Sequence, residues 1–299
     1  MGLTLRGYVA LPPHAADGFD HGDVDRASGQ VFVAHTATGS VEVLDGERLA
    51  HLATIPGCPE ASGVLCAQGD GLVFAAARGG GVVLVLDVAS RAVRRTVAVG
   101  PKPNGLAWDA GRGRLLVADV EDFRARLVDP TTGDLLASAE LPGRPRWCVY
   151  DRRGDRFLVN IREPACVAVL DAATLAPATQ WDSPVAGPHG LDLDDAGGRA
   201  FVACDGGATV VLDLRTGRAV ASVPIAGEPD AIWYDPVRER LYVAVGRPGV
   251  IQVVDCRALR VVEQVITEVG AHTTAFDPGR QRLYVFLPGS GRAAVYDAT

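Results

Sequence analysis

Seven polar or charged residues occupy one position of a 42-residue frame that runs through the chain. They are Asp20, Ser62, Asn104, Arg146, His189, Asp230 and His272, with His189 displaced by one residue from the frame. Imidazole and carboxylate groups are ligands of Zn²⁺ and other divalent cations, and they also serve as general acids and bases. We therefore expect a divalent metal ion (Zn²⁺, Mg²⁺ or Ca²⁺) on four members of this set, which are Asp20, His189, Asp230 and His272. The alternatives for His189 and His272 are acid–base catalysis and simple lining of a water-filled channel.

Residues near this set offer groups that bind an anionic or aromatic ligand. Arg146 and Trp147 supply a guanidinium cation and a flat ring, and we expect Arg146 both to bind the substrate and to act in catalysis. A second column, at the end of the second apolar segment of each repeat, is mostly apolar but contains His35 and Asp119. Together with Asn104, these two residues are expected to contact the substrate.

The 42-residue frame is set by short apolar segments that end in aspartate. Seven of these aspartates are spaced by 42 residues without exception: Asp45, Asp87, Asp129, Asp171, Asp213, Asp255 and Asp297. Each repeat contains four apolar segments, which in the third repeat span 105–108, 114–119, 125–128 and 135–141. Such segments are too short for helices, and the Gly- and Asp-rich turns between them are typical of β-hairpins. We interpret each repeated aspartate as a turn residue that accepts backbone N–H groups two residues on.

Seven repeats of four short segments predict an all-β fold, a seven-bladed β-propeller with four antiparallel strands per blade. The first strand of each propeller blade lines the central channel, so the residues of the first column would gather at one mouth of that channel. The last repeat lacks a fourth segment, and residues 3–11 can supply it from the N-terminus. Residues 1–299 would then form a single domain, a ring closed by both ends of the chain.

Composition narrows the class of partner. The chain has 299 residues, of which 48% are hydrophobic, and a formal net charge of -7. The apolar content excludes a disordered chain, and an acidic balance without a Lys or Arg cluster argues against a nucleic-acid partner. No apolar run is long enough to span a membrane and no secretion signal is recognised, so a cytoplasmic location is expected. The six cysteines lack C-x-x-C spacing and are predicted to be small buried side chains.

The repeats resemble those of the YVTN-type seven-bladed β-propellers, the group that includes the YncE-like proteins. Residues 241–245 (Leu-Tyr-Val-Ala-Val) and 283–287 (Leu-Tyr-Val-Phe-Leu) stand where that family has its Tyr-Val-Thr-Asn motif. Residues 100–107 (Gly-Pro-Lys-Pro-Asn-Gly-Leu-Ala) are similar to the sequence with which that family begins a blade. The resemblance covers essentially the whole chain. It implies the fold strongly and the function weakly, because the group includes binding, scaffold and enzymatic propellers.

Three functions fit the sequence. The first is a metal-dependent enzyme, a lyase or hydrolase that acts on a small anionic or cyclic substrate at the channel mouth. Residues 188–190 (Pro-His-Gly) are similar to a motif of the virginiamycin B lyases, whose two histidines stand in adjacent blades, whereas here Asp230 stands between His189 and His272. The alternatives are a non-catalytic propeller that binds a small molecule or a metal, and a protein-interaction scaffold. No phosphate-binding loop or dinucleotide fingerprint occurs, so no organic cofactor is expected.

Overall fold

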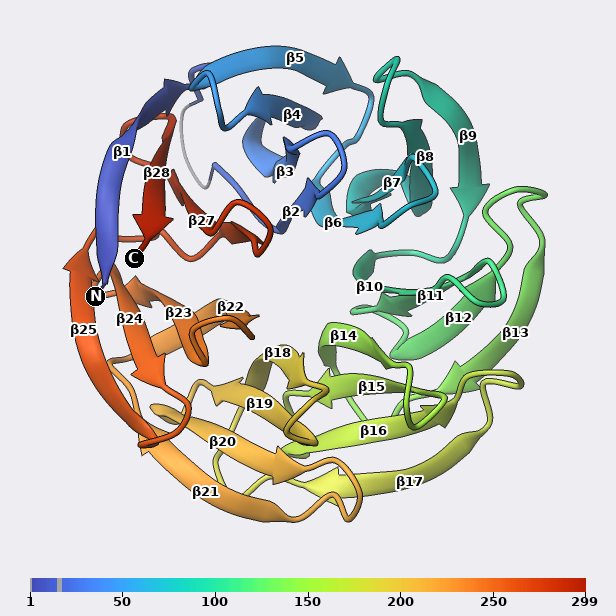
Figure 1. Ribbon diagram of the computed structural model, residues 1–299. Helices are drawn as coiled ribbons and strands as arrows, with labels where there is room; N and C mark the ends of the chain where they lie inside the picture. Colours follow the sequence, from blue (N-terminus) through green and yellow to red (C-terminus); the bar gives the residue numbers. More distant parts are fainter. Residues whose placement is uncertain (1, 15–17) are drawn as a thin grey trace.

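The chain folds into a ring of antiparallel sheets. The computed structural model describes residues 2–14 and 18–299, and these contain 28 β-strands in seven four-stranded sheets. The sheets are arranged as blades around a central axis, with the first strand of each blade nearest to the axis and the fourth at the rim (Figure 1). The predicted all-β, seven-bladed propeller is therefore confirmed.

The blades are numbered in chain order, and six of them consist of four consecutive strands. Blade one contains β2 (Gly22–Asp25), β3 (Gln30–His35), β4 (Ser40–Asp45) and β5 (Ala50–Pro56). Blade two contains β6 (Ala61–Ala67), β7 (Leu72–Ala77), β8 (Val82–Asp87) and β9 (Val93–Ala98). Blade three contains β10 (Pro103–Asp109), β11 (Arg114–Asp119), β12 (Arg124–Val128) and β13 (Leu135–Glu140). Blade four contains β14 (Pro145–Asp151), β15 (Arg156–Ile161), β16 (Cys166–Asp171) and β17 (Pro177–Asp182). Blade five contains β18 (Pro188–Asp194), β19 (Arg199–Cys204), β20 (Ala208–Asp213) and β21 (Ala219–Pro224). Blade six contains β22 (Glu228–Asp235), β23 (Arg240–Arg247), β24 (Val250–Asp255) and β25 (Arg260–Ile266). Two short 3-10 helices, η1 (Thr36–Thr38) and η2 (Arg78–Gly80), follow β3 and β7.

Blade seven joins the two ends of the chain, as the sequence predicts. It contains β26 (Thr274–Asp277), β27 (Arg282–Leu287) and β28 (Arg292–Ala298), and its outer strand is β1 (Leu3–Ala10). β1 pairs antiparallel with β28, with Leu3 opposite Ala298, and the two strands lie side by side in Figure 1. Backbone hydrogen bonds between strands from opposite chain ends therefore close the ring.

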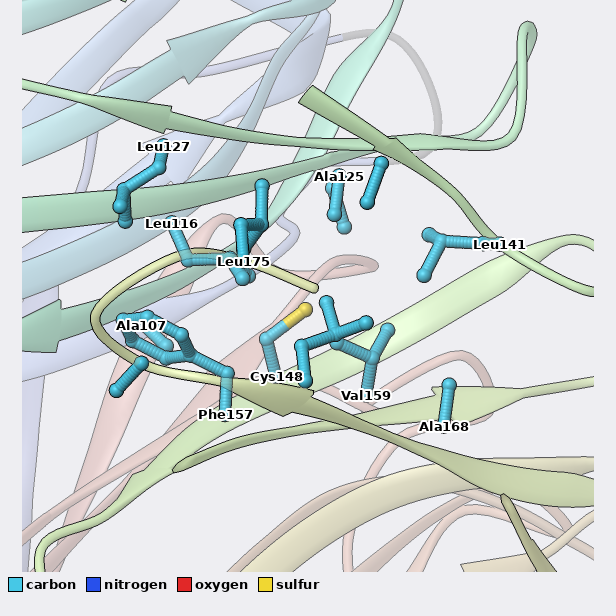
Figure 2. Packing of buried hydrophobic residues seen from close by; sticks show 14 of the residues in the cluster. Ala107, Leu116, Ala125, Leu127, Leu141, Cys148, Phe157, Val159, Ala168 and Leu175 are labelled. Atoms are coloured by element: carbon cyan, nitrogen blue, oxygen red, sulfur yellow. The ribbon is translucent and has the colours of Figure 1, made fainter. Parts of the chain in front are cut away.

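Apolar side chains form a separate core between each pair of neighbouring blades. Between blades three and four, Leu116 and Leu127 of one sheet belong to the same buried cluster as Phe157 and Val159 of the next (Figure 2). These four side chains are at most 1% exposed. Because each blade is covered on both faces, its middle strands form continuous apolar runs, which is why the repeat is visible in the sequence.

Six of the seven repeated aspartates cap turns, as predicted, whereas Asp297 instead pairs with the side chains of Arg282 and Arg6. Asp129 Oδ1 accepts hydrogen bonds from the backbone N–H groups of Thr131 (2.7 Å) and Thr132 (3.1 Å). Asp45 and Asp171 accept the equivalent pairs of N–H groups in blades one and four. These carboxylates therefore stabilise hairpins and contribute to the net charge without belonging to a site.

The cysteines are structural. All six are buried and free of disulfide bonds, as the sequence predicts. Burial raises the pKa of Cys58 to about 12, so this thiol stays protonated and unreactive at neutral pH. Across residues 2–14 and 18–299, no helix is long and apolar enough to cross a bilayer.

Candidate functional site

The residues of the first column gather at one mouth of the central channel. A cavity of about 170 Å³, here called the upper cavity, is lined by Asp20, His21, Arg78, Asn104, Arg146, Trp147, His189, Asp230 and His272. Six of the seven column residues are among them. The seventh, Ser62, is fully buried and donates its hydroxyl to the backbone oxygen of Pro103 over 3.0 Å.

An irregular stretch of the first strands presents these side chains to the channel. Arg146, His189 and Asp230 are the second or third residues of β14, β18 and β22. In each of these strands the pairing with the second strand shifts register at this place, as between Pro188 and Leu191. Such bulges re-aim side chains and are frequent beside functional sites. The mouth residues therefore leave the regular alternation of the sheet.

His189 lies between two carboxylates. Its Nδ1–H donates a hydrogen bond to Asp205 Oδ1 over 3.1 Å, and its Nε2 is 3.3 Å from Asp230 Oδ1. The Asp230 carboxylate also approaches His272, whose Nε2 is 3.8 Å from Oδ2. A carboxylate that holds Nδ1–H fixes the tautomer and orientation of an imidazole, which leaves Nε2 to exchange a proton or to bind a cation.

The sequence columns do not single out Asp205, and a local change in the repeat explains why. The loop 183–187 before β18 has one residue more than the loop 141–144 before β14, and the loop 205–207 after β19 has one fewer than 162–165 after β15. These changes compensate each other and shift part of blade five against the frame. Asp205 then directly follows the second strand of its blade, where blades two and four have Arg78 and Arg162. A reversal of charge at that position is the signal that could have identified it.

Both carboxylates beside His189 are ionised at neutral pH. Burial would raise the pKa of Asp205, but the adjacent His189 and the charge of Arg162, whose Nε is 2.9 Å from Asp205 Oδ2, hold this pKa below its usual value. Burial would likewise raise the pKa of Asp230, but the neighbouring histidines and Arg146 lower it overall. The imidazole of His189 therefore lies between two ionised carboxylates, one of which also pairs with Arg162.

Arg146 contributes a cation that lacks a counter-ion. Within the part of the chain that the structure describes, its guanidinium forms no ion pair, and its Nε is buried without a hydrogen-bond partner. Burial lowers the pKa of Arg146, and the negative charges of Asp230 and Asp205 only partly oppose this. A buried charge is costly unless it is paired. A guanidinium of this kind at a cavity wall indicates a position for an anionic group.

Asp20 is engaged by the Arg78 guanidinium and by the His21 imidazole, so it is not a free ligand. Arg78 Nη2 contacts Asp20 Oδ2, and His21 Nε2 is 3.4 Å from Asp20 Oδ1. Of the four predicted metal ligands, the structure therefore brings three together, which are His189, Asp230 and His272. It places Asp20 in a separate pair on the blade-one side of the cavity.

Trp147 forms the floor of the upper cavity with His21. The two rings stack with centroids 4.2 Å apart and an interplanar angle of 27°. At the equivalent position, blades three and five have Gly105 and Gly190. A Cβ on Gly190 would lie 2.0 Å from the backbone oxygen of Asp230, so a side chain there would collide with the neighbouring blade.

Asp119, a predicted substrate contact, lies outside the upper cavity. It is fully buried, and its carboxylate accepts backbone N–H groups from Lys102 (2.7 Å), Glu121 (2.9 Å) and Asp122 (3.1 Å). These bonds hold the hairpin loop between β11 and β12. Asp119 therefore has a structural role in this arrangement.

His35, the other residue of that column, belongs to a buried chain of hydrogen bonds inside blade one. Its Nδ1 is 3.1 Å from Glu42 Oε1, its Nε2 is 2.9 Å from His14 Nδ1, and His14 Nε2 is 2.9 Å from the backbone oxygen of Pro288. The two ends of this hydrogen-bonded series are acceptors, the Glu42 carboxylate and the Pro288 carbonyl. Burial would raise the pKa of Glu42, but hydrogen bonds from His35 and its other donors lower the pKa to about 2. His35 is therefore held inside the blade, away from the channel.

The predicted metal ion finds an incomplete set of donors. Among residues 2–14 and 18–299, no group of three or more His, Cys, Asp or Glu side chains is arranged to hold a metal ion. One pair of donors, His189 Nε2 and Asp230 Oδ1, does fit a cation. These two atoms are 3.3 Å apart, and two donors of a tetrahedral Zn²⁺ site are separated by about the same distance. Asp230 Oδ1 is also buried without a hydrogen-bond partner.

Comparison with known proteins does not assign this chain to a family. Neither a scan against protein-family models nor a search of the curated proteins finds a match to this chain. The fold and the site define a seven-bladed β-propeller with charged side chains at one channel mouth. The relationship to the YVTN-type propellers stays a prediction that rests on residues 100–107, 241–245 and 283–287.

Proposed function

We propose that the protein binds a small anionic molecule in the upper cavity and acts on it by proton transfer, as a lyase or hydrolase. One observation carries the proposal: the same cavity holds an unpaired guanidinium, Arg146, and a carboxylate-flanked imidazole, His189. A guanidinium binds carboxylate or phosphate groups through two parallel hydrogen bonds. An imidazole whose Nδ1–H is held by a carboxylate is oriented to accept or donate a proton at Nε2.

The site assigns a separate task to each side chain. Arg146 holds the anionic group, Asn104 orients the ligand, and the Trp147 ring closes the floor beneath it. His189 exchanges a proton with the ligand through Nε2, and Asp205 stabilises the imidazolium that forms. The upper cavity continues into a cavity of about 230 Å³ that shares Arg146 and His189. Together they approach the size of small-molecule pockets, about 300–1,000 Å³.

Calorimetric titration with acetate, malonate, succinate, citrate and phosphate at constant ionic strength tests the binding step. We expect at least one of these anions to bind saturably, and Arg146→Gln to weaken it about tenfold, as expected for a lost charged hydrogen bond. Arg124→Gln, on the outer part of blade three, is the matched control and should bind like the wild type. Binding no tighter than that of chloride, or equal binding by Arg146→Gln, would refute the proposal.

The catalytic step is tested by screening lactones and cyclic depsipeptides that carry a carboxylate, together with phosphodiesters, for turnover. His189→Gln should abolish turnover of any substrate found while the anion still binds. If His189→Gln retains the wild-type rate, proton transfer does not pass through this imidazole.

A divalent cation is the second candidate occupant of this mouth. The observation that favours it is Asp230 Oδ1, buried without a donor and facing His189 Nε2. His189, Asp230 and His272 would hold the ion, which would polarise a bound substrate. Metal analysis of purified protein, with thermal unfolding in Zn²⁺, Mg²⁺, Ca²⁺ or EDTA, tests it. Stoichiometric metal, with stabilisation lost in His272→Gln, would support the candidate, and metal-free protein indifferent to all four additives would exclude it.

A further inference from the structure

A second and larger cavity lies at the opposite mouth of the channel. Its volume is about 370 Å³, and its lining includes Trp108, Trp147, Trp233, Tyr150, Asp23 and Asp192. We call it the lower cavity. Whereas the upper cavity is lined by residues that begin the first strands, Trp108 and Tyr150 are the last residues but one of β10 and β14. The stack of His21 on Trp147 contributes to both cavities and lies between them.

The indole rings of the lower cavity are held in fixed positions. Trp108 Nε1–H donates to Asp70 Oδ2 over 3.0 Å, and Trp233 Nε1–H donates to Thr274 Oγ1 over 3.1 Å. Trp147 and Trp233 meet edge to face, with centroids 6.1 Å apart and an interplanar angle of 87°. Each of the three indoles is only half-buried. The cavity therefore presents a preorganised aromatic wall to a ligand.

Two carboxylates lie in this wall without a cationic partner. Asp23 accepts hydrogen bonds from the backbone N–H groups of Val24 (2.7 Å) and Cys66 (2.8 Å). Asp192 accepts the equivalent bonds from Leu193 (2.8 Å) and Tyr234 (2.6 Å). Within the described part of the chain, neither forms an ion pair with Lys or Arg. At the same position, blades two and three have the apolar side chains Leu65 and Ala107. The carboxylates are therefore not a requirement of the blade.

The lower cavity carries a net negative charge when both carboxylates are ionised. Burial raises the pKa of Asp23 and of Asp192 to about 6 in each case, against the opposing effect of the backbone N–H groups, so both are largely ionised at pH 7. Among the lining residues, Arg26 is the one Lys or Arg, and its side chain is exposed. Burial also lowers the pKa of His21, which is therefore neutral. Since Arg26 opposes these two carboxylates only in part, an anion would meet net repulsion here.

We propose that the lower cavity binds a small organic cation, an amine with an aromatic ring or a quaternary ammonium group, between the indole rings and the carboxylates of Asp23 and Asp192. Aromatic faces attract cations through their quadrupole, and the attraction is strongest for indole and for partly desolvated ions. The carboxylates supply the complementary charge, and the apolar walls accommodate the organic part of the ligand. This site is independent of the anion proposed for the upper cavity, although the two share one wall.

Intrinsic fluorescence gives a direct test, because three of the four tryptophans line this cavity. The fourth, Trp181, is removed as Trp181→Phe so that the remaining signal comes from the site. Benzyltrimethylammonium is the cationic probe, with benzyl alcohol and benzenesulfonate as neutral and anionic probes of similar shape, all at constant ionic strength. We expect a saturable change with the cation, affinity about tenfold lower for the neutral probe, and no saturation with the anion.

Asp192→Asn should weaken the cation about tenfold, while Asp195→Asn, in the adjacent turn, should leave its affinity unchanged. Asp23→Asn provides an independent loss of charge if Asp192→Asn fails to fold, as judged by circular dichroism. Absence of a saturable response to the cation up to roughly 10 mM would overturn the proposal. So would equal affinity for benzenesulfonate, or wild-type affinity in the Asp-to-Asn variants that fold.

Discussion

The imidazole of His21 stacks on the indole of Trp147 across the central channel, with ring centroids 4.2 Å apart. His21 precedes β2 in blade one, and Trp147 belongs to β14 in blade four, so the contact spans the ring. Because burial lowers the pKa of His21, the contact at neutral pH joins two uncharged rings. It divides the channel into a polar upper cavity and an aromatic lower cavity.

His21→Ala should open a passage between the two cavities. Loss of the ring contact removes about 0.5–1.5 kcal/mol of stacking and lets water reach Trp147. In a Trp181→Phe background, we expect red-shifted emission and stronger quenching by acrylamide. His51→Ala, which removes an imidazole at the rim of blade one, should leave the emission unchanged. If His21→Ala quenches like the parent, the stack does not separate the cavities.

Gly190→Ala should separate blades five and six. The new Cβ would meet the backbone oxygen of Asp230 at 2.0 Å, and backbone can move aside only with its whole strand. We expect a loss of about 1–3 kcal/mol in the free energy of unfolding, as for other overpacked sites. Gly80→Ala is the control, since its Cβ meets nothing closer than 3.5 Å. Equal urea midpoints for the two variants would contradict this interpretation.

Glu42→Gln should destabilise blade one. It removes a buried carboxylate that is hydrogen-bonded to four side chains, and each buried partner left unsatisfied costs about 1–3 kcal/mol. Glu140→Gln removes an exposed carboxylate paired with Arg124 and should cost less than about 1 kcal/mol. Urea unfolding at pH 7 measures both.

The same glutamate predicts a direction for acid unfolding. The pKa of Glu42 is about 2 in the folded protein against 4.5 ordinarily, so its contribution is fully present above about pH 4.5. That contribution is lost as the pH falls from about 4.5 towards 2. The difference in stability between wild type and Glu42→Gln should therefore shrink at pH 3. A constant difference would show that Glu42 acts through packing alone.

Asp23 should have the opposite pH dependence. Its pKa is raised from 3.8 to about 6, so folding favours the protonated form, and the carboxylate destabilises the native state increasingly as the pH rises from about 4 to 6. The full effect is about 3 kcal/mol at neutral pH, since one pKa unit corresponds to 1.36 kcal/mol. The free energy of unfolding of Asp23→Asn should therefore increase relative to that of wild type as the pH rises over this range. Any hydrogen bonds that the substitution weakens lower its stability by the same amount at every pH. Asp134→Asn, an exposed turn residue, should follow the wild-type profile, and a parallel profile for Asp23→Asn would refute the assignment.

The fold is predictable from the sequence because every blade repeats the same short apolar segments and turns. In blade three the predicted segments 105–108, 114–119, 125–128 and 135–141 agree with β10 to β13 to within two residues. The first strand begins earlier than its apolar run because Pro103 already pairs with Asp119, across a register shift that precedes Gly105. The residues of this bulge, which include Asn104 at the channel mouth, are not part of the apolar pattern. The apolar pattern therefore predicts the start of the strand too late.

The site was only partly predictable. Equivalent positions in neighbouring blades must lie near each other around a ring, so the gathering of His189, Asp230 and His272 follows from the frame. The pairing of Asp20 with Arg78 depends on how far a long side chain extends from one blade to the next. Alignment of the repeats does not predict such a contact. His35 was also misplaced by the sequence analysis. Its position in the 42-residue repeat predicts which end of the blade it occupies, but not whether its side chain points into the channel or into the blade. Glu42, an acidic residue inside an apolar strand, was the available signal that a buried polar partner was needed.

The join between β1 and β28 has a consequence for how the protein is made. β1 leaves the ribosome before any other strand, whereas its partner β28 spans Arg292–Ala298 and emerges after all of them. Blades one to six can be completed in order during translation, but β1 has no partner in its own sheet until the end. A nascent chain therefore carries one unpaired strand throughout its synthesis, and such strand edges promote aggregation. A chain truncated before β28 would therefore be an open ring in which β1 has no partner strand.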